Sequence, residues 1–233
     1  MQETKQMTRM DKGEEKRKLR SASLLNWLLF ACEVFSLGWM ISGISTGPFS
    51  ARSFGSLRYF TVDSNLLLGI FALIAAIAEG KAAAGKKESV SPLIYILKLM
   101  GTVGTTLTML VTALYLAPTS SYGYFSLFAQ STLFLHLINP LLGLVVFWGF
   151  ERTKELSFKH TFTGVLPMLL YSIYYVEETL RHLEGESVMQ GYDWYGFLVM
   201  GVRSVAVILP LFIFITYLIS LVLWKINRGG KKA

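Results

Sequence analysis

Residues 57–78 read Leu-Arg-Tyr-Phe-Thr-Val-Asp-Ser-Asn-Leu-Leu-Leu-Gly-Ile-Phe-Ala-Leu-Ile-Ala-Ala-Ile-Ala, a polar opening followed by 13 residues without a polar side chain. An α-helix needs about 20 largely apolar residues to cross the hydrocarbon core of a bilayer. The polar opening falls within that length, and lipid tolerates such side chains only where they face a protein interior. The stretch therefore predicts a membrane-spanning helix with a functional polar patch near one end.

Similar apolar segments recur along the whole chain. Of its 233 residues, 53% are hydrophobic and only 16% are charged, whereas about a quarter are charged in soluble proteins. We predict an all-α integral membrane protein with six spans, at residues 24–44, 57–78, 93–116, 125–150, 161–180 and 197–224. Residues 1–23 and 225–233 are expected to form basic, solvated and disordered tails. The single cysteine, Cys32, excludes an internal disulfide and is expected to be a small apolar residue.

The distribution of Lys and Arg predicts the orientation. The tails and the second and fourth loops together hold seventeen, whereas the odd-numbered loops hold three. Cytoplasmic loops carry the excess of positive charge, so both termini are expected in the cytoplasm. Because the basic residues alternate by loop instead of forming one patch, nucleic acid is not an expected partner. The run 12–20 is too polar for a cleavable signal, so the first helix is expected to be retained.

Ten polar residues are expected at membrane depth. Counting along the helices places Glu33 and His136 near the midplane, whereas Lys98 lies near enough to the cytoplasm to extend its ammonium to water. The others cluster toward the outer side, which predicts a polar chamber there. The complete set is Glu33, Thr61, Asp63, Ser64, Asn65, Lys98, His136, Asn139, Glu177 and Arg203.

Two of these polar patches share helical faces and are expected to meet. Thr61, Ser64 and Asn65 lie on one face by their spacing, and His136 and Asn139 lie on another, just before Pro140. Each residue also has a purely structural interpretation. Thr61 could bond its own backbone, His136 could join helices, and Glu33 or Asp63 could pair with an arginine. No second membrane histidine is available for a metal, so no metal or other cofactor is expected.

The two patches carry a resemblance to a known family. The segment Arg58-Tyr-Phe-Thr61-Val-Asp-Ser-Asn65 and the segment Leu135-His136-Leu-Ile-Asn-Pro140 resemble the second and fourth spans of the androgen-induced and androgen-dependent membrane proteins, most closely their bacterial branch. The segment 191–197 looks like the family's aromatic tract but lacks its prolines. The resemblance implies a multi-pass protein of a bacterial plasma membrane. It also implies a threonine hydrolase of fatty-acid esters of hydroxy fatty acids, with Thr61 as nucleophile and His136 as partner.

We therefore expect a membrane-embedded hydrolase whose partners are membrane lipids and a fatty-acyl ester substrate. Helical rise places Thr61 about 9 Å shallower than His136, so the two meet only if a helix starts elsewhere or bends. The remaining roles follow from position alone. Supporting or oxyanion candidates are Ser64, Asn65, Asn139, Asp63 and Glu33, and chamber candidates are Glu177, Arg203 and Tyr192.

Two other functions remain open on the sequence. The first is a small transporter or channel, with Glu33, Asp63, His136 and Arg203 forming a proton or anion path. The second is a non-catalytic scaffold that keeps only the packing core. The oligomeric state is not predicted.

Overall fold

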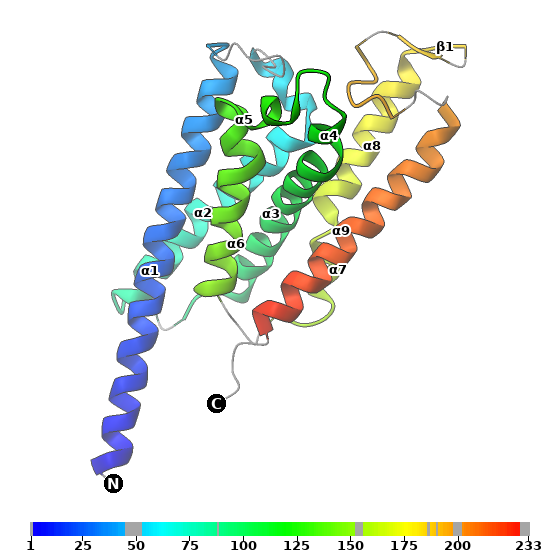
Figure 1. The fold of residues 1–233 in the computed structure, drawn as a ribbon. Helices are drawn as coiled ribbons and strands as arrows, with labels where there is room; N and C mark the ends of the chain where they lie inside the picture. The colour runs from blue at the N-terminus through cyan, green and yellow to red at the C-terminus, as the bar shows by residue number, and fades with distance from the viewer. Residues whose placement is uncertain are drawn as a thin grey trace.

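The chain forms an almost entirely helical bundle (Figure 1). The computed structural model describes residues 2–44, 53–87, 89–151, 156–185, 187–189, 191–197 and 202–228. Within these residues, five helices are long and apolar enough to cross a membrane: Lys12–Ile41, Phe60–Ala83, Pro92–Thr119, Ser131–Gly149 and Val205–Arg228. The predicted class, an all-α protein of membrane-spanning helices, is confirmed at this level. Residues 198–201 of the sixth predicted span and 229–233 of the C-terminal tail lie outside the described residues.

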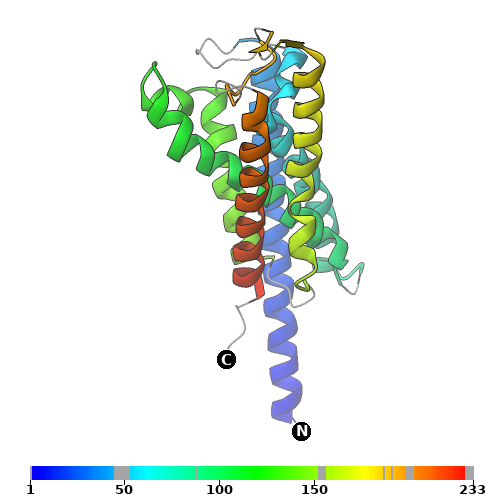
Figure 2. The same ribbon diagram turned by 90° about the vertical axis from the view of Figure 1, so that its right-hand side faces the viewer.

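The first helix, α1 (Gln2–Ile41), is much longer than its apolar part. Its polar first half projects beyond the bundle (Figure 2). The prediction that residues 1–23 are disordered was wrong for residues 2–23, which are helical. Helix-forming Lys, Arg, Glu and Met fill this segment, and a 2.8 Å ion pair joins Glu14 to Lys18 one turn apart.

Small residues set how closely the central helices approach. Helices α2 (Phe60–Ala83), α3 (Pro92–Val111) and α6 (Asn139–Gly149) meet around the buried side chain of Leu68. A Cβ at Gly101 would lie 2.9 Å from the Leu68 backbone, and one at Gly143 would lie 3.1 Å from its side chain. Close approach through glycine is typical of membrane helices, where packing replaces the hydrophobic effect.

The fourth predicted span begins later than expected. Residues 125–130 do not belong to it, because a short 3₁₀ helix, η3 (Tyr124–Phe128), lies across the end of the bundle. Gln130 then takes a left-handed conformation with φ 57°. The span proper follows as α5 (Ser131–Leu133), a π-helical turn η4 (Phe134–Ile138) and α6. His136 therefore lies six residues closer to the start of its helix than the predicted boundary implies.

The fifth predicted span is divided in two. Helix α7 (His160–Thr163) is followed by α8 (Leu166–Arg181), whose 16 residues extend about 24 Å. That is shorter than the roughly 30 Å hydrocarbon core. Gly164 separates the two helices at a tight contact, since a Cβ there would lie 2.3 Å from Ser220 Oγ of α9 (Val205–Arg228).

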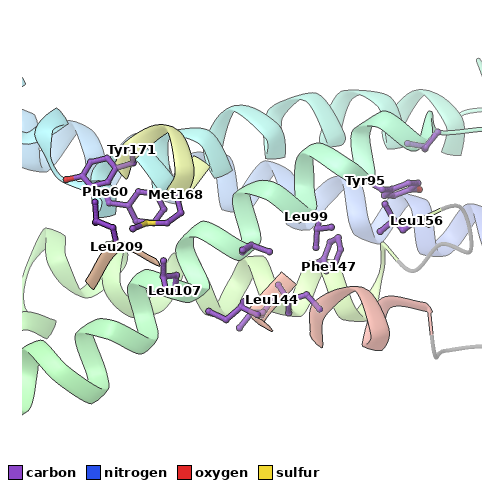
Figure 3. Close-up of a cluster of buried hydrophobic side chains, with 14 of the residues drawn as sticks. Phe60, Tyr95, Leu99, Leu107, Leu144, Phe147, Leu156, Met168, Tyr171 and Leu209 are labelled. Atoms are coloured by element: carbon purple, nitrogen blue, oxygen red, sulfur yellow. The ribbon is translucent and has the colours of Figure 1, made fainter. Parts of the chain in front are cut away.

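The successive helices run up and down, so that α1 begins and α9 ends at the same end of the bundle (Figure 1). The opposite end, called here the outer end, carries η1 (Ser53–Arg58) and α4 (Ala117–Thr119). A two-stranded hairpin, β1 (Leu183–Glu184) with β2 (Ser187–Val188), also lies there, and η5 (Val202–Ser204) precedes α9. Figure 3 shows the apolar core, which runs the length of α3 from Leu107, Met168 and Tyr171 to Leu99 and Phe147.

Candidate active site

A cavity of about 710 Å³ lies among the elements of the outer end. Thr61 of α2 and His136 of η4 both line it, although 75 residues separate them in sequence. The late start of the fourth span is the reason, because it raises His136 toward the level of Thr61. No direct hydrogen bond joins the two side chains within the described part of the chain. The structure therefore places the two predicted catalytic residues in one chamber.

The Thr61 hydroxyl differs from most threonine hydroxyls of the bundle, although the buried Thr102 hydroxyl also has no hydrogen-bond partner. In α3, the hydroxyls of Thr105, Thr106 and Thr108 all donate to carbonyls four residues earlier. This is the ordinary behaviour of threonine in a membrane helix. Thr61 lies in the first turn of α2, is half-buried, and makes no such bond to any described residue. Its oxygen is consequently free to react.

The first turn of α2 also offers a backbone donor. The N–H groups of Val62 and Asp63 donate to Tyr59 O, and that of Phe60 donates to the Tyr195 hydroxyl. Among the described residues, the Thr61 N–H has no acceptor. Such groups at a helix N-terminus favour negative charge, as an oxyanion requires.

His136 is held in one tautomer by the backbone. Its Nδ1 lies 2.7 Å from the carbonyl oxygen of Leu127, in the 3₁₀ helix that precedes the span. A carbonyl only accepts, so Nδ1 carries the hydrogen and, in the neutral ring, Nε2 carries the lone pair. The ring is 6% exposed and packs edge-on against Phe128. Nε2 is thus the nitrogen available as a base.

Pro140 explains why the helix is π-helical at His136. The Asn139 N–H donates five residues back, to Phe134 O, so it no longer serves Leu135 O. The next candidate donor for Leu135 O is residue 140, a proline without an N–H. Asn65 Nδ2 of α2 donates to Leu135 O instead, at 3.1 Å. A side chain of one polar patch therefore completes the backbone of the other.

A second π-helical turn, also followed by a proline, lies beside the cavity. The π-helical turn η2 (Thr112–Leu116) precedes Pro118, and the Ala117 N–H donates to Thr112 O. Ala113 O is left without a helical donor, and the Tyr124 hydroxyl donates to it at 3.2 Å. Short π segments are frequent at functional sites, and here both adjoin one chamber.

The cavity contains a cation that the sequence did not single out as a site residue. Arg58 lines the chamber, with its guanidinium 5.2 Å from the ring centre of Tyr59 and 5.8 Å from that of Trp194. It donates to Tyr59 Oη at 3.2 Å and to Gly191 O at 3.3 Å. An arginine within the quoted motif was the available signal. Its partner Tyr59 is the next residue, but Gly191 and Trp194 come from a loop far along the chain. Desolvation raises the pKa of nearby Tyr195, which therefore stays a neutral hydrogen-bonding group.

A second, smaller and more apolar pocket adjoins the chamber. It lies between α2, α3, α8 and α9, and its walls include Leu107, Met168, Leu209 and Phe212. Thr61 lines both spaces. Thr61 thus lies where the larger chamber meets the more apolar pocket.

The supporting candidates lie deeper than the chamber, with most of their donors engaged. Asn65 donates to Thr61 O and Leu135 O, and Asn139 donates to Glu33 Oε2 at 2.8 Å. Ser64 is buried against Thr108. None of these side chains lines the chamber. Neither does half-buried Asp63. The Thr61 N–H is therefore a better candidate for an oxyanion donor than any of these side chains.

The three chamber candidates also lie outside the cavity. Glu177 pairs with Arg181 at the surface, and Arg203 is exposed. Tyr192 stacks on His182 with a 3.5 Å ring separation. The four residues of the transport alternative are likewise not gathered, because Glu33 bonds Asn139 while Arg203 faces outward.

Lys98 does not extend to water, contrary to expectation. Its side chain is fully buried, donates to Asn26 Oδ1 at 2.7 Å, and lies 3.7 Å from Glu151 Oε1. Asn26 in turn donates to Glu79 and Glu151. We call these four residues the inner cluster. They join α1, α2, α3 and the end of α6, where buried carboxylates retain an ammonium that would otherwise reach water.

Within the described residues no group of three or more His, Cys, Asp or Glu could hold a metal. No family model matches the chain, and no similar curated protein or solved structure was found. The family resemblance therefore stays a prediction, and the chemistry must be argued from the site itself.

Proposed function

We propose that the protein is an intramembrane lipid-ester hydrolase with Thr61 as nucleophile and His136 as base. One observation carries the proposal: an unbonded threonine hydroxyl and a histidine of fixed tautomer line the same chamber. Activated hydroxyl nucleophiles need a neighbouring base whose ring is oriented by a third group. Here the third group is the Leu127 carbonyl, which accepts the Nδ1 hydrogen and leaves Nε2 available to accept a proton.

The reaction is acyl transfer to water. His136 Nε2 takes the Thr61 proton, directly once substrate is bound or through one water, as Oγ1 attacks the ester carbonyl carbon. The oxyanion of the tetrahedral intermediate forms beside the Thr61 N–H at the positive end of α2. The carbon–oxygen bond to the alcohol then breaks, and His136 returns the proton to that alcohol. Water repeats the sequence on the acyl-threonine, releasing the acid.

The two chambers suggest how a substrate is held. The apolar pocket walled by Met168 and Leu209 has a free volume of only about 40 Å³, so its walls must part before it admits the acyl chain. The ester then reaches Thr61 at the junction of the two spaces. The polar chamber then holds the alcohol part, and Arg58 there suits an anionic group. Fatty-acid esters of hydroxy fatty acids have this composition, since they keep one free carboxylate.

We further propose six crossings of a bacterial plasma membrane, with both termini cytoplasmic. Five spanning helices leave α7 and α8 as the sixth crossing, and together they cover His160–Arg181 with one break at Gly164. Lys and Arg of the tails and even-numbered loops support this orientation.

The decisive experiment is hydrolysis of medium-chain and branched fatty-acid esters by the purified protein and matched variants. Thr61→Ala and His136→Ala should each lower kcat by about 10³-fold or more, as for other catalytic nucleophile–base pairs. Thr61→Ser keeps the nucleophile and should keep part of the activity. Thr106→Ala is the control, since that hydroxyl only bonds Thr102 O. Equal hydrolysis by all variants would reject Thr61 and His136 as the catalytic pair and indicate another nucleophile. Ion flux into liposomes that does not depend on Thr61 would instead indicate a transporter.

A further inference from the structure

Buried oxygen atoms converge on the Asn139 amide in the middle of the bundle. Asn139 Nδ2 lies 2.8 Å from Glu33 Oε2, 3.1 Å from Ser36 Oγ and 3.4 Å from Asn65 Oδ1. The four side chains come from α1, α2 and α6, and none is more than 1% exposed. Three oxygens thus surround the Asn139 nitrogen in a place that water does not reach.

The donors of this group are too few for its acceptors. The amide of Asn139 has two hydrogens for three oxygens, and the Ser36 hydroxyl donates to Glu33 O of its own helix. Both hydrogens of Asn65 serve the carbonyls of Thr61 and Leu135. Glu33 Oε1 and Asn139 Oδ1 are buried with no hydrogen-bond partner. Buried acceptors without donors are costly, so this site is short of positive charge.

The wider charge balance points the same way. Three carboxylates are fully buried in the described structure, those of Glu33, Glu79 and Glu151, against one buried ammonium, that of Lys98. Lys98 already bonds Asn26 and faces Glu151. Glu33 is left without an ion pair among the described residues. A charged carboxylate in a membrane interior needs a counter-ion or a proton.

We propose that Glu33, Ser36, Asn65 and Asn139 form a sodium-binding site. Rotating the Asn139 amide by half a turn puts its oxygen in the place of its nitrogen, beside the oxygens of Glu33, Ser36 and Asn65. A sodium ion that enters between these groups then has four oxygen ligands. Hard cations take oxygen ligands from carboxylates, amides and hydroxyls. One carboxylate with three neutral oxygens balances a single positive charge. Mg²⁺ and Ca²⁺ demand more carboxylates or more waters than this dry site offers.

The site would also support the chamber above it. Asn65, one of its ligands, donates to Leu135 O, the carbonyl beside His136 that the π-helical turn leaves open. An ion that fixes Asn65 therefore stabilises the backbone that presents His136. The binding itself does not depend on whether the protein is a hydrolase.

Binding is tested on the purified full chain in detergent, with sodium chloride exchanged for choline chloride at constant ionic strength. A ligand that binds only the folded state raises Tm, by roughly 3–5 °C for each tenfold rise in sodium above Kd. Radioactive sodium should bind at about one ion per chain and be displaced by unlabelled sodium more effectively than by potassium. The probe in both assays is sodium itself.

Glu33→Gln should abolish both the Tm response and the binding, while Ser36→Ala, a milder change, should weaken them without unfolding the protein. Glu79→Gln is the matched control, because it also removes a fully buried carboxylate and should keep the sodium response. The proposal is wrong if the Tm of the wild type does not change with sodium concentration or changes only with pH. It is also wrong if Glu79→Gln loses the sodium dependence of Tm as completely as Glu33→Gln.

Discussion

Two side chains of the chamber acquire their chemistry from the backbone around them. Thr61 is free because it lies in the first helical turn, and His136 is oriented because a 3₁₀ helix presents the Leu127 carbonyl to Nδ1. Neither property belongs to the residue type. A threonine one turn further along a helix can donate to the carbonyl four residues earlier, as Thr106 does to Thr102 O in α3.

Arg58 is predicted to select for anionic substrates. Arg58→Gln removes the charge but keeps a polar side chain of similar length, so esters with a free carboxylate should show KM raised about 10- to 100-fold, the range for a charge-assisted hydrogen bond. Because Arg58 has no part in the proposed proton transfers or in breaking the ester bond, kcat should change little. Steady-state kinetics with a carboxylated ester and its methyl ester would measure this, and the methyl ester should be nearly unaffected.

Arg181→Gln is the matched control for Arg58, since it removes an exposed guanidinium paired only with Glu177. Its kinetics should resemble those of the wild type. A uniform rise of KM for both esters in Arg58→Gln would contradict charge selection and indicate that the residue merely shapes the chamber.

At the site, the sequence predicted that the two polar patches meet, but not how Thr61 and His136 come to the same level. These two residues were singled out because a hydroxyl and an imidazole suit nucleophilic hydrolysis and because their segments carry the family resemblance. Their common chamber depends on where the fourth span begins, and hydropathy could not place that boundary because η3 is as apolar as the helix after it. Two partners of Arg58, Gly191 and Trp194, lie in a distant loop, and no local sequence pattern predicts such contacts.

The two π-helical turns are consequences of prolines rather than of local hydropathy. Each ends two residues before a proline and leaves one carbonyl that a side chain from elsewhere fills: Asn65 for Leu135 O, and Tyr124 for Ala113 O. A π turn holds one residue more than the α-helix it interrupts. Removing it therefore rotates the preceding side chains by about 100° relative to the following ones.

Pro140→Ala is predicted to lower activity without unfolding the protein. With an N–H at residue 140, the segment can return to α-helical bonding, which turns His136 away from the chamber and competes with Asn65 for Leu135 O. We expect kcat to fall by about tenfold or more while Tm stays equal or rises, since interior prolines cost helix stability. Ester hydrolysis and thermal unfolding of the same preparation would show both effects.

Pro210→Ala serves as the control, because this proline lies inside α9 away from the chamber. Its activity should stay near that of the wild type. If both proline variants lose activity equally, general helix flexibility and not the position of His136 accounts for the loss.

The elements themselves were predictable to different degrees. Spans one to three and six were predicted from long apolar runs, and the described residues include five helices that are long and apolar enough to cross a membrane. The fifth predicted span is the exception, since Gly164 and Pro167 divide it and α8 alone is short. The helical form of residues 2–23 was not predicted, because a polar run of this composition is compatible with both a helix and a disordered tail.

In the whole molecule, the inner cluster of Asn26, Glu79, Lys98 and Glu151 holds four segments together at the end opposite the chamber. Lys98→Met is predicted to destabilise the fold by about 3–5 kcal/mol, because two carboxylates stay buried without their ammonium. Unfolding in detergent would measure the loss. Adding Glu151→Gln to Lys98→Met should recover part of it, and no recovery would contradict the charge argument.

The orientation of the bundle gives the last prediction, which applies to single-cysteine variants in a Cys32→Ala background. Tyr122 follows α4 and Glu184 belongs to β1, two elements of the outer end, whereas Lys86 follows α2 and Arg228 ends α9, and both of these helices end where α1 begins (Figure 1). A membrane-impermeant maleimide added to intact cells should label Tyr122→Cys and Glu184→Cys, and should label the other two only after lysis, because basic ends stay in the cytoplasm. Arg228→Cys is the critical variant. Its labelling from outside would mean that α7 and α8 do not cross, and that the chain has five crossings.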